Sequence, residues 1–348
     1  MKKYNEIIDF ILKNGSPNLK YRTKKEILGE SCDTDNMKKL QKQILELPKV
    51  KKAFSVQKEN GFLGNVLHGG YFDGFDSTVM LLKNNGVEIS NPSLQRAKEC
   101  LLNWRNYEKD HFYKGGNYMD EHGRGGFKAI IAELLVELGC DEDNLMVQEQ
   151  IKSALDNFKG ALLHESLDDF TRQCKFQGKD CRYYIKGCKF PAANHIKILE
   201  RTISWRNKEN LDMVKKSYEH CKRLIGDYSG VIYINCGYML GPFNHNWNIH
   251  VIEDIHEFDN KPIDFAWWMR GLALATPVQP ITYKPISGVG EKLKAWIYSD
   301  DILSELTDEH IRLFKKYASL EPAWRRNESI LCDIYFPLVL GLNRAGII

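Results

Sequence analysis

Two glycine-rich loops carry the side chains best suited to chemistry. Their ionisable residues are His68, Asp73 and Asp76 in the first loop, and Asp120, Glu121, His122 and Arg124 in the second. An imidazole beside a carboxylate can serve as a general acid or base, and a guanidinium clamps carboxylate or phosphate groups. His68 or His122 is therefore the candidate acid or base. Asp76 and Glu121 are the candidate orienting carboxylates, and Arg124 and Arg206 are the candidate anion clamps.

The same loops also have purely structural interpretations. Asp76 would then cap the helix that follows it, Asp73 would close a turn, and the histidines would bind loop carbonyls. A further alternative is a carbohydrate enzyme, which needs two carboxylates across a cleft about 5–10 Å apart. Asp76 and Glu121 are the pair that would supply them.

Four possible metal ligands recur at a spacing of seven residues: Cys174, Cys181, Cys188 and His195. Zinc prefers thiolate and imidazole ligands. The spacing is wider than a Cys-x-x-Cys chelate, and intervening glycines and Pro191 prevent one helix from presenting all four side chains. Buried thiols packing as small apolar groups are the alternative. Cys188 and His195 are kept as the candidate zinc ligands.

Histidines and carboxylates also gather in residues 243–259, FNHNWNIHVIEDIHEFD. Such a mixture suits a divalent ion, but the spacing matches no compact chelate such as His-Glu-x-x-His. We expect an extended segment with its polar groups facing outward.

Aromatic side chains are frequent, and those beside arginine or near the loops favour an apolar or planar ligand. The candidate ligand-binding residues, besides Arg124, are Trp104, Tyr118, Trp205 and Arg206. Ordinary core packing is the alternative for most of the aromatic residues.

Helix pairs must position these loops. Apolar residues three and four apart predict a pair of helices after each of three loops, the third loop being residues 174–191. The expected helices span 75–83 and 92–102, 129–138 and 145–158, and 193–202 and 211–225. A short strand is expected near 231–234. Repeats of about 50 residues, each a helix pair, are typical of stacked helical architectures; the alternative is an irregular all-α domain.

Residues 1–50 have helical periodicity and are rich in Lys and Glu, and Pro48 closes them. We expect an N-terminal helical extension over 1–50, packed on a main domain over 51–348. The fold class that this organisation predicts is all-α.

The segment Gln57-Lys-Glu-Asn-Gly61-Phe62 resembles the repeat motif of the terpenoid cyclase and protein prenyltransferase superfamily, whose loops run from Gln through Gly and a variable residue to Trp. Further counterparts of the family pattern are His68, Ser77 to Leu82, Gly86-Val87, Pro92, Ala97 and Leu101-Leu102. The resemblance is closest over 53–104 and covers roughly half of the chain. It implies an α/α toroid or incomplete α/α barrel of stacked helix pairs.

The resemblance does not imply an activity. Leu63 stands where the repeat has its Trp, and Ser299-Asp300-Asp301 lacks the first carboxylate of the Asp-x-Asp-Asp motif. Glu253-Asp254-Ile-His-Glu257 is the nearest approach to Asp-Asp-x-x-Asp. Protein prenyltransferases use an Asp/Cys/His zinc site, so the resemblance implies zinc as the metal to consider for the Cys and His candidates.

Composition narrows the class of protein. The 348 residues have a net charge of +3, with basic residues spread along the chain, so bulk electrostatics give no case for nucleic acid. No run of about 18 apolar residues occurs, so no membrane span is expected. Nine scattered cysteines suit reduced thiols in a cytoplasmic protein.

These features favour a cytoplasmic enzyme or binding protein that holds a small-molecule organic ligand at the loop-bearing end of the helical barrel. The alternative is a non-catalytic scaffold whose concave surface binds a peptide or nucleic acid. An enzyme requires the histidines and arginines of the loops to converge, whereas a scaffold would disperse them. The substrate, the reaction and the oligomeric state have no signal in the sequence.

Overall fold

Helices make up most of the described chain, which confirms the prediction of a mainly helical fold. The computed structural model describes residues 2–103, 114–226, 228, 232–234, 238–240, 262–273, 303 and 306–344. The N-terminal helices are α1 (Lys2–Asn14), α2 (Pro17–Arg22), the π-helix η1 (Thr23–Ile27), α3 (Asp35–Leu45) and α4 (Pro48–Ser55). The central helices are α5 (Phe75–Asn84), α6 (Pro92–Leu102), α7 (Lys114–Glu121), α8 (Phe127–Glu137), α9 (Leu145–Ala161), α10 (Leu167–Phe170), α11 (Ala193–Arg201) and α12 (Lys208–Ile225). The last helices are α14 (Pro262–Leu272), α16 (Asp308–Tyr317) and α17 (Asn327–Arg344).

A small sheet is formed by strands that precede and follow the α11–α12 helix pair in the chain. Its strands, in spatial order, are β1 (Thr171–Phe176), β2 (Lys179–Tyr184), β3 (Ile232–Ile234) and β4 (Tyr238–Leu240). The first and last pairs are antiparallel, and β2 and β3 are parallel. Gln177 and Gly178 form the β1–β2 turn with φ of 50° and 76°, and two positive φ values suit a two-residue hairpin. The expected loop over 174–191 is therefore wrong in its first half, because that half is a hairpin.

Each of the three expected helix pairs is present, and the second helix of each pair opens on an asparagine. The carboxamide oxygens of Asn91, Asn144 and Asn207 each accept a hydrogen bond from a backbone amide two or three residues later, at 2.8–3.1 Å. These caps satisfy amides that the helix itself leaves unpaired. The cap at Asn207 explains why α12 begins at Lys208, before the expected start.

The first helices of the pairs, α5, α8 and α11, meet at their C-terminal ends. Lys83 in the last turn of α5 donates to the carboxylate of Glu137, the last residue of α8. Arg201, the last residue of α11, donates from Nε to the same carboxylate at 2.5 Å. At the opposite end, Asn194 of α11 donates to the carbonyl of Gly125, just before α8, at 2.7 Å. Because they contact at both ends, α8 and α11 run parallel, and their preceding loops share one end.

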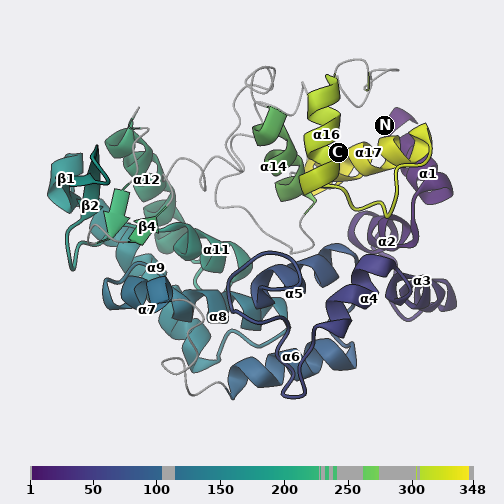
Figure 1. Cartoon of the computed structure of the whole chain (residues 1–348), viewed down its shortest axis with the longest axis horizontal. Coiled ribbons are helices and arrows are strands. Elements are labelled where there is room, and N and C mark those ends of the chain that lie inside the picture. Colours follow the sequence, from purple (N-terminus) through teal and green to yellow (C-terminus); the bar gives the residue numbers. More distant parts are fainter. Residues whose placement is uncertain are drawn as a thin grey trace.

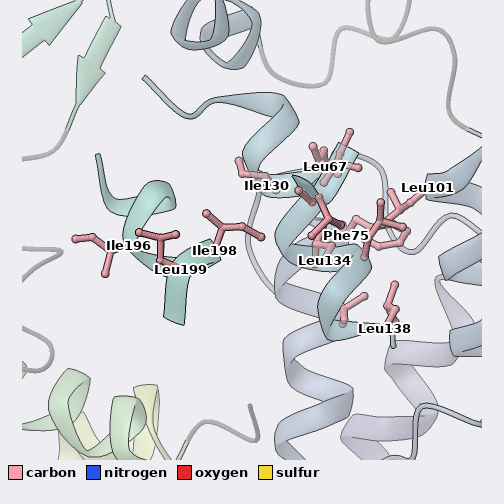
Figure 2. Close-up of a cluster of buried hydrophobic side chains, with 14 of the residues drawn as sticks. Leu67, Phe75, Leu101, Ile130, Leu134, Leu138, Ile196, Ile198 and Leu199 are labelled. Atoms are coloured by element: carbon pink, nitrogen blue, oxygen red, sulfur yellow. The ribbon is translucent and has the colours of Figure 1, made fainter. Parts of the chain in front are cut away.

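Two apolar cores hold the chain together. The larger core contains α2 to α6, the helix pairs and the sheet, and the smaller core joins α1 to α14, α16 and α17. In Figure 1 the helix pairs run from the centre of the view to its left side, and α1 lies beside α17. Figure 2 shows Leu67 of the first loop in one cluster with side chains of three repeat helices: Phe75, Ile130, Leu134, Leu138, Ile196, Ile198 and Leu199.

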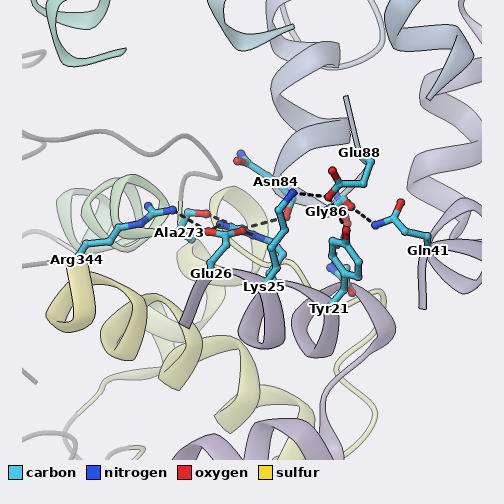
Figure 3. A network of polar contacts seen from close by, with 12 residues as sticks. Tyr21, Lys25, Glu26, Gln41, Asn84, Gly86, Glu88, Ala273 and Arg344 are labelled. Carbon is cyan, nitrogen blue, oxygen red and sulfur yellow. Dashed lines mark hydrogen bonds and ion pairs between the residues drawn. The ribbon is translucent and has the colours of Figure 1, made fainter. Parts of the chain in front are cut away.

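Polar contacts tie the N-terminal segment to both cores. Arg22 is fully buried, and its Nη1 donates to the carbonyls of Asn84 at 3.1 Å and Ala273 at 2.6 Å. Its Nε donates at 2.5 Å to Glu26, whose carboxylate also accepts from Arg344 at 2.7 Å (Figure 3). Residues 1–50 thus contact both α5 and the C-terminal helices. Their division from the main domain at residue 50 stays a prediction.

Two buried carboxyl groups lie where α2 approaches the start of α17. Asp333 accepts hydrogen bonds from the Ser319 hydroxyl at 2.6 Å and from Trp324 Nε1 at 2.7 Å. Glu321 accepts from the backbone amide of Ser16 at 2.7 Å. Burial, aided by the charge of Asp333, raises the pKa of Glu321 to about 7.

Glu321 is expected to make the free energy of unfolding fall as the pH rises from 4.5, its ordinary pKa, to about 7. The folded state holds this proton more tightly than the unfolded state, so the stabilisation is complete below pH 4.5 and is lost as the pH rises through 7. Glu321→Gln keeps an oxygen acceptor for Ser16 and should remove about 2 kcal/mol of this dependence. Urea unfolding across this pH range measures it, and an unchanged slope in the variant would contradict the assignment.

Candidate functional site

His68 and Asp76 form a hydrogen-bonded pair at the start of α5. His68 Nδ1 lies 2.5 Å from Asp76 Oδ2, and the other carboxylate oxygen accepts from the amides of Gly69 at 3.3 Å and Ser77 at 2.6 Å. The His68 side chain is 50% exposed and that of Asp76 is 21% exposed. A carboxylate on Nδ1 fixes the orientation of an imidazole, as acid or base catalysis requires.

The loop before α5 folds back on itself to place this pair. The amides of Asn65 and Val66 both donate to the carbonyl of Asp73, at 2.7 and 3.1 Å. Gly64 has φ of 85°, and a Cβ there would lie 2.3 Å from the same carbonyl, so only glycine fits the crossing. The sequence expectation that Asp73 closes a turn is consistent with the Asn65 side-chain bond to its carboxylate at 2.9 Å.

In the second loop, Asp120 binds the start of α8. Its carboxylate accepts from the amides of Gly126 at 2.9 Å and Lys128 at 3.0 Å. Burial raises the pKa of Asp120, and these two hydrogen bonds oppose the rise. The neighbouring Glu121 is exposed at the end of α7, and His122 is half-buried.

Arg124 is the unusual residue of this loop. It is 1% exposed, its Nη1 donates to the carbonyl of Phe190, and its Cζ lies 3.8 Å from the centre of the Tyr184 ring. Its Nε has no hydrogen-bond partner, and it has no carboxylate partner among the described residues. A guanidinium stays protonated inside a protein, and a buried charge without a counter-ion is costly. Within the part of the chain that the structure describes, this cation therefore has no anion beside it.

His195 lies beside the same loop in the first turn of α11. It is fully buried, and its Nδ1 accepts from the amide of Ala192 at 3.0 Å, so the proton of the neutral ring is on Nε2. Burial, followed by the charges of Arg124 and Lys189, lowers the pKa of His195 to about 3. Its Nε2 has no hydrogen-bond partner. Arg124 and His195 thus each bury an N–H group that none of the described residues satisfies.

Gly125 sets how closely these two residues approach. Its φ is +63°, and a Cβ there would lie 2.8 Å from His195 Nε2. Gly125→Ala is expected to cost about 2–4 kcal/mol of unfolding free energy, the sum of left-handed backbone strain and overpacking.

Gly123→Ala is the matched control for Gly125→Ala. Gly123 has φ of +65°, and a Cβ there would meet no atom within 4 Å. Gly123→Ala should therefore lower the unfolding free energy only through left-handed backbone strain, by about 1–2 kcal/mol. Urea unfolding of the two variants separates strain from packing, and equal losses would contradict a tight contact between Gly125 and His195.

The cysteine series does not assemble into one cluster. Cys174 and Cys181 face each other across β1 and β2, whereas Cys188 follows β2 and His195 opens α11. Burial raises the pKa of Cys188, and the charge of Arg124 opposes the rise. Over the part of the chain that the structure describes, no group of three or more His, Cys, Asp or Glu residues is arranged to hold a metal ion. Zinc binding by Cys188 and His195 stays a prediction.

Trp205 and Arg206 bind backbone carbonyls at the end of α11. Trp205 Nε1 donates to Leu199 at 3.0 Å and to Thr202 at 3.1 Å. Arg206 donates from Nε to Thr202 at 2.8 Å and from Nη2 to Leu199 and Glu200 at 3.1 Å. A cation and donors at this position complement the unpaired carbonyls of a helix C-terminus. Their contacts place them at the opposite end of α11 from His195.

Other candidates lie beyond what the structure describes. Trp104 and residues 243–259 and 299–301 are outside the described residues. Tyr118 lies in α7, but only its backbone is described.

The sequence interpretation missed Tyr184 and Phe190, the residues that hold Arg124. The signal that would have located Tyr184 is the Gln177-Gly178 turn between two runs of strand-forming residues, which is typical of a hairpin. Phe190 has no such signal, because it contacts Arg124 through a backbone carbonyl 66 residues away.

Comparisons with protein-family models, with curated proteins and with solved structures found no match. Within the described ranges, no helix combines the length and apolar character needed to cross a membrane. The site therefore has to be interpreted from its own geometry.

Proposed function

We propose that this protein binds a small organic anion, with a carboxylate or phosphate group, at the loop-bearing end of an α/α barrel built from the α5–α6, α8–α9 and α11–α12 pairs. The observation that carries the proposal is the buried Arg124 guanidinium, which stacks on Tyr184 and has no carboxylate partner among the described residues. An anion placed against its Nε would supply the missing charge and hydrogen bond.

The surroundings of Arg124 favour an anion over a neutral ligand. Arg124 lies just before the start of α8, and His195 lies in the first turn of α11. Helix N-termini carry partial positive charge, which stabilises anions; at α8 the Asp120 carboxylate already binds two of the amides. His195 Nε2 adds a buried neutral donor that needs an acceptor. Two donors at the N-terminal ends of two parallel helices suit the oxygens of one carboxylate or phosphate group.

The His68–Asp76 pair would supply chemistry at the same end. Lys83 and Glu137 join the C-terminal ends of α5 and α8, so in the proposed barrel the N-terminal ends of these helices lie on one side. His68 is half-exposed and oriented by Asp76, as a general acid or base would be. We propose that it acts on the exposed part of a ligand whose anionic group is held by Arg124. The superfamily resemblance of this repeat supports the barrel and not a particular reaction.

The proposal is tested by thermal unfolding in rising concentrations of inorganic phosphate, acetate and succinate, at constant ionic strength set with sodium chloride. At least one of these anions should raise the unfolding midpoint saturably in the wild-type protein. Arg124→Met should lose that response. Arg325→Met, which removes an exposed arginine, should keep it. An equal response in all three proteins, or none in the wild type, would refute anion binding at Arg124.

A further inference from the structure

We infer that Cys174 and Cys181 form a dithiol that a peroxide converts reversibly into a cross-strand disulfide. Both residues are thiols in this structure, and their sulfur atoms are 2.9 Å apart. This pair is separate from the anion site at Arg124, and the inference does not depend on the proposed function.

The backbone already holds these two cysteines in a geometry that a disulfide accepts. They are directly opposite each other in the antiparallel β1–β2 ladder. Opposed residues in such a ladder have Cα atoms about 4.5–5.5 Å apart, within the range of about 4.4–6.8 Å that disulfides span. Bond formation requires the sulfurs to approach to about 2.05 Å, a movement of less than about 1 Å. Side-chain rotation supplies such a movement without a change of register.

The hairpin fixes this register. Its two-residue turn at Gln177 and Gly178 pairs Phe176 with Lys179. Two residues further along each strand, this register places Cys174 opposite Cys181. The Arg182 side chain, which is opposite Gln173 in the ladder, also donates diagonally across the strands from Nε to the Thr171 hydroxyl at 2.6 Å. The thiols are therefore held together by the fold and do not depend on a chance encounter.

The two sulfurs differ in exposure, which gives each a role. Cys181 is 7% exposed, whereas Cys174 is only partly buried. The more accessible thiolate, Cys174, attacks the peroxide, and the O–O bond breaks to give a sulfenic acid and one water. The Cys181 sulfur then attacks the Cys174 sulfur and expels a second water. Two thiols lose two electrons and two protons, and one hydrogen peroxide becomes two waters. A dithiol reductant reverses the step by exchange.

Peptide mapping of the full-length protein tests the inference. Reduced protein is treated with hydrogen peroxide, remaining thiols are alkylated, and the chain is digested with trypsin without reduction. Cleavage after Arg172, Lys175, Lys179 and Arg182 separates the two cysteines. We expect Gln173–Lys175 to be recovered joined to Asp180–Arg182, and to be released by dithiothreitol. Recovery of both peptides only in alkylated form would overturn the inference.

The mapping also distinguishes the neighbouring thiol. A link between Asp180–Arg182 and Gly187–Lys189 would mean that Cys181 pairs with Cys188, and would overturn the assignment. Cys174→Ser changes the more exposed partner, so it should fold and lose the linked peptide. Cys188→Ser should keep it. The unfolding midpoint of the wild-type protein should rise by a few degrees on oxidation, and that of Cys174→Ser should not. Equal midpoint shifts in both proteins would contradict a stabilising disulfide between Cys174 and Cys181.

Discussion

Replacing Glu137 by glutamine is expected to lower the free energy of unfolding by about 3–5 kcal/mol, because it removes the negative charge that Lys83 and Arg201 share. Arg201 keeps a second carboxylate, that of Glu133, at 3.2 Å. The Glu137 side chain is fully buried, and the Arg201 side chain is 4% exposed. Glutamine has nearly the same shape, so the loss comes from the charge. Urea unfolding at neutral pH measures it.

The matched control for Glu137→Gln is Glu309→Gln. Glu309 pairs with Arg312 at 2.6 Å, but both side chains are about half exposed. Water and salt screen such a pair, so its loss should cost much less than the loss of the buried Glu137 charge. A similar, small loss of unfolding free energy in both variants would mean that the Glu137 contacts between α5, α8 and α11 do not stabilise the fold as the structure indicates.

Replacing Arg124 by methionine is expected to abolish stabilisation by the bound anion while leaving the anion-free protein nearly as stable as the wild type. At an anion concentration of 100 times Kd, binding should add about 2.7 kcal/mol to the unfolding free energy of the wild type and nothing to that of the variant. In the absence of the anion, the lost hydrogen bond to Phe190 and stacking on Tyr184 are offset by removal of an uncompensated buried charge.

This pattern separates a ligand site from a structural arginine. If Arg124 only supported the fold, methionine would destabilise the protein equally with and without the anion. Chemical unfolding of both proteins in phosphate or succinate and in sodium chloride of equal ionic strength gives the four values needed. A loss in the variant that is independent of the anion would contradict the proposed function.

The helix pairs were predictable because their signals are local. Pro92 and Asn91 mark the start of one helix, and Gly86 and Gly139, with φ of 78° and 75°, mark the turns that end two others. Such residues act through their own backbone or that of near neighbours. The sequence therefore locates all six expected helices to within three residues, and α12 starts earlier than expected because of its cap at Asn207.

The site was only partly predictable because it depends on distant segments. The sequence identified Arg124 as an anion clamp and paired His68 with Asp76 in one loop. It did not indicate that Arg124 is buried, since its contacts with Tyr184 and Phe190 arise only when the hairpin and the residues after it pack against the loop before α8. Cys174 and Cys181 were interpreted as part of a metal series for the same reason: their pairing depends on the turn between them.

The same distinction applies to the arginine candidates. Arg124 and Arg206 are both near aromatic residues in the sequence or the fold, and both were candidates to bind an anion. Arg206 donates to three carbonyls at the end of α11, which satisfies its guanidinium within the protein. Arg124 donates to one carbonyl through Nη1 and has an unpaired Nε. Only the count of hydrogen-bond partners separates the two, and the sequence does not supply that count.

The most direct measurement of the central claim is the ¹⁵N–¹H signal of the Arg124 Nε–H group, assigned by its loss in Arg124→Met. This signal should shift saturably on addition of inorganic phosphate, acetate or succinate at constant ionic strength, and the Nε–H signal of exposed Arg325 should not. An Arg124 signal that stays unchanged with all three anions would contradict the claim that the buried Arg124 guanidinium binds an anionic ligand.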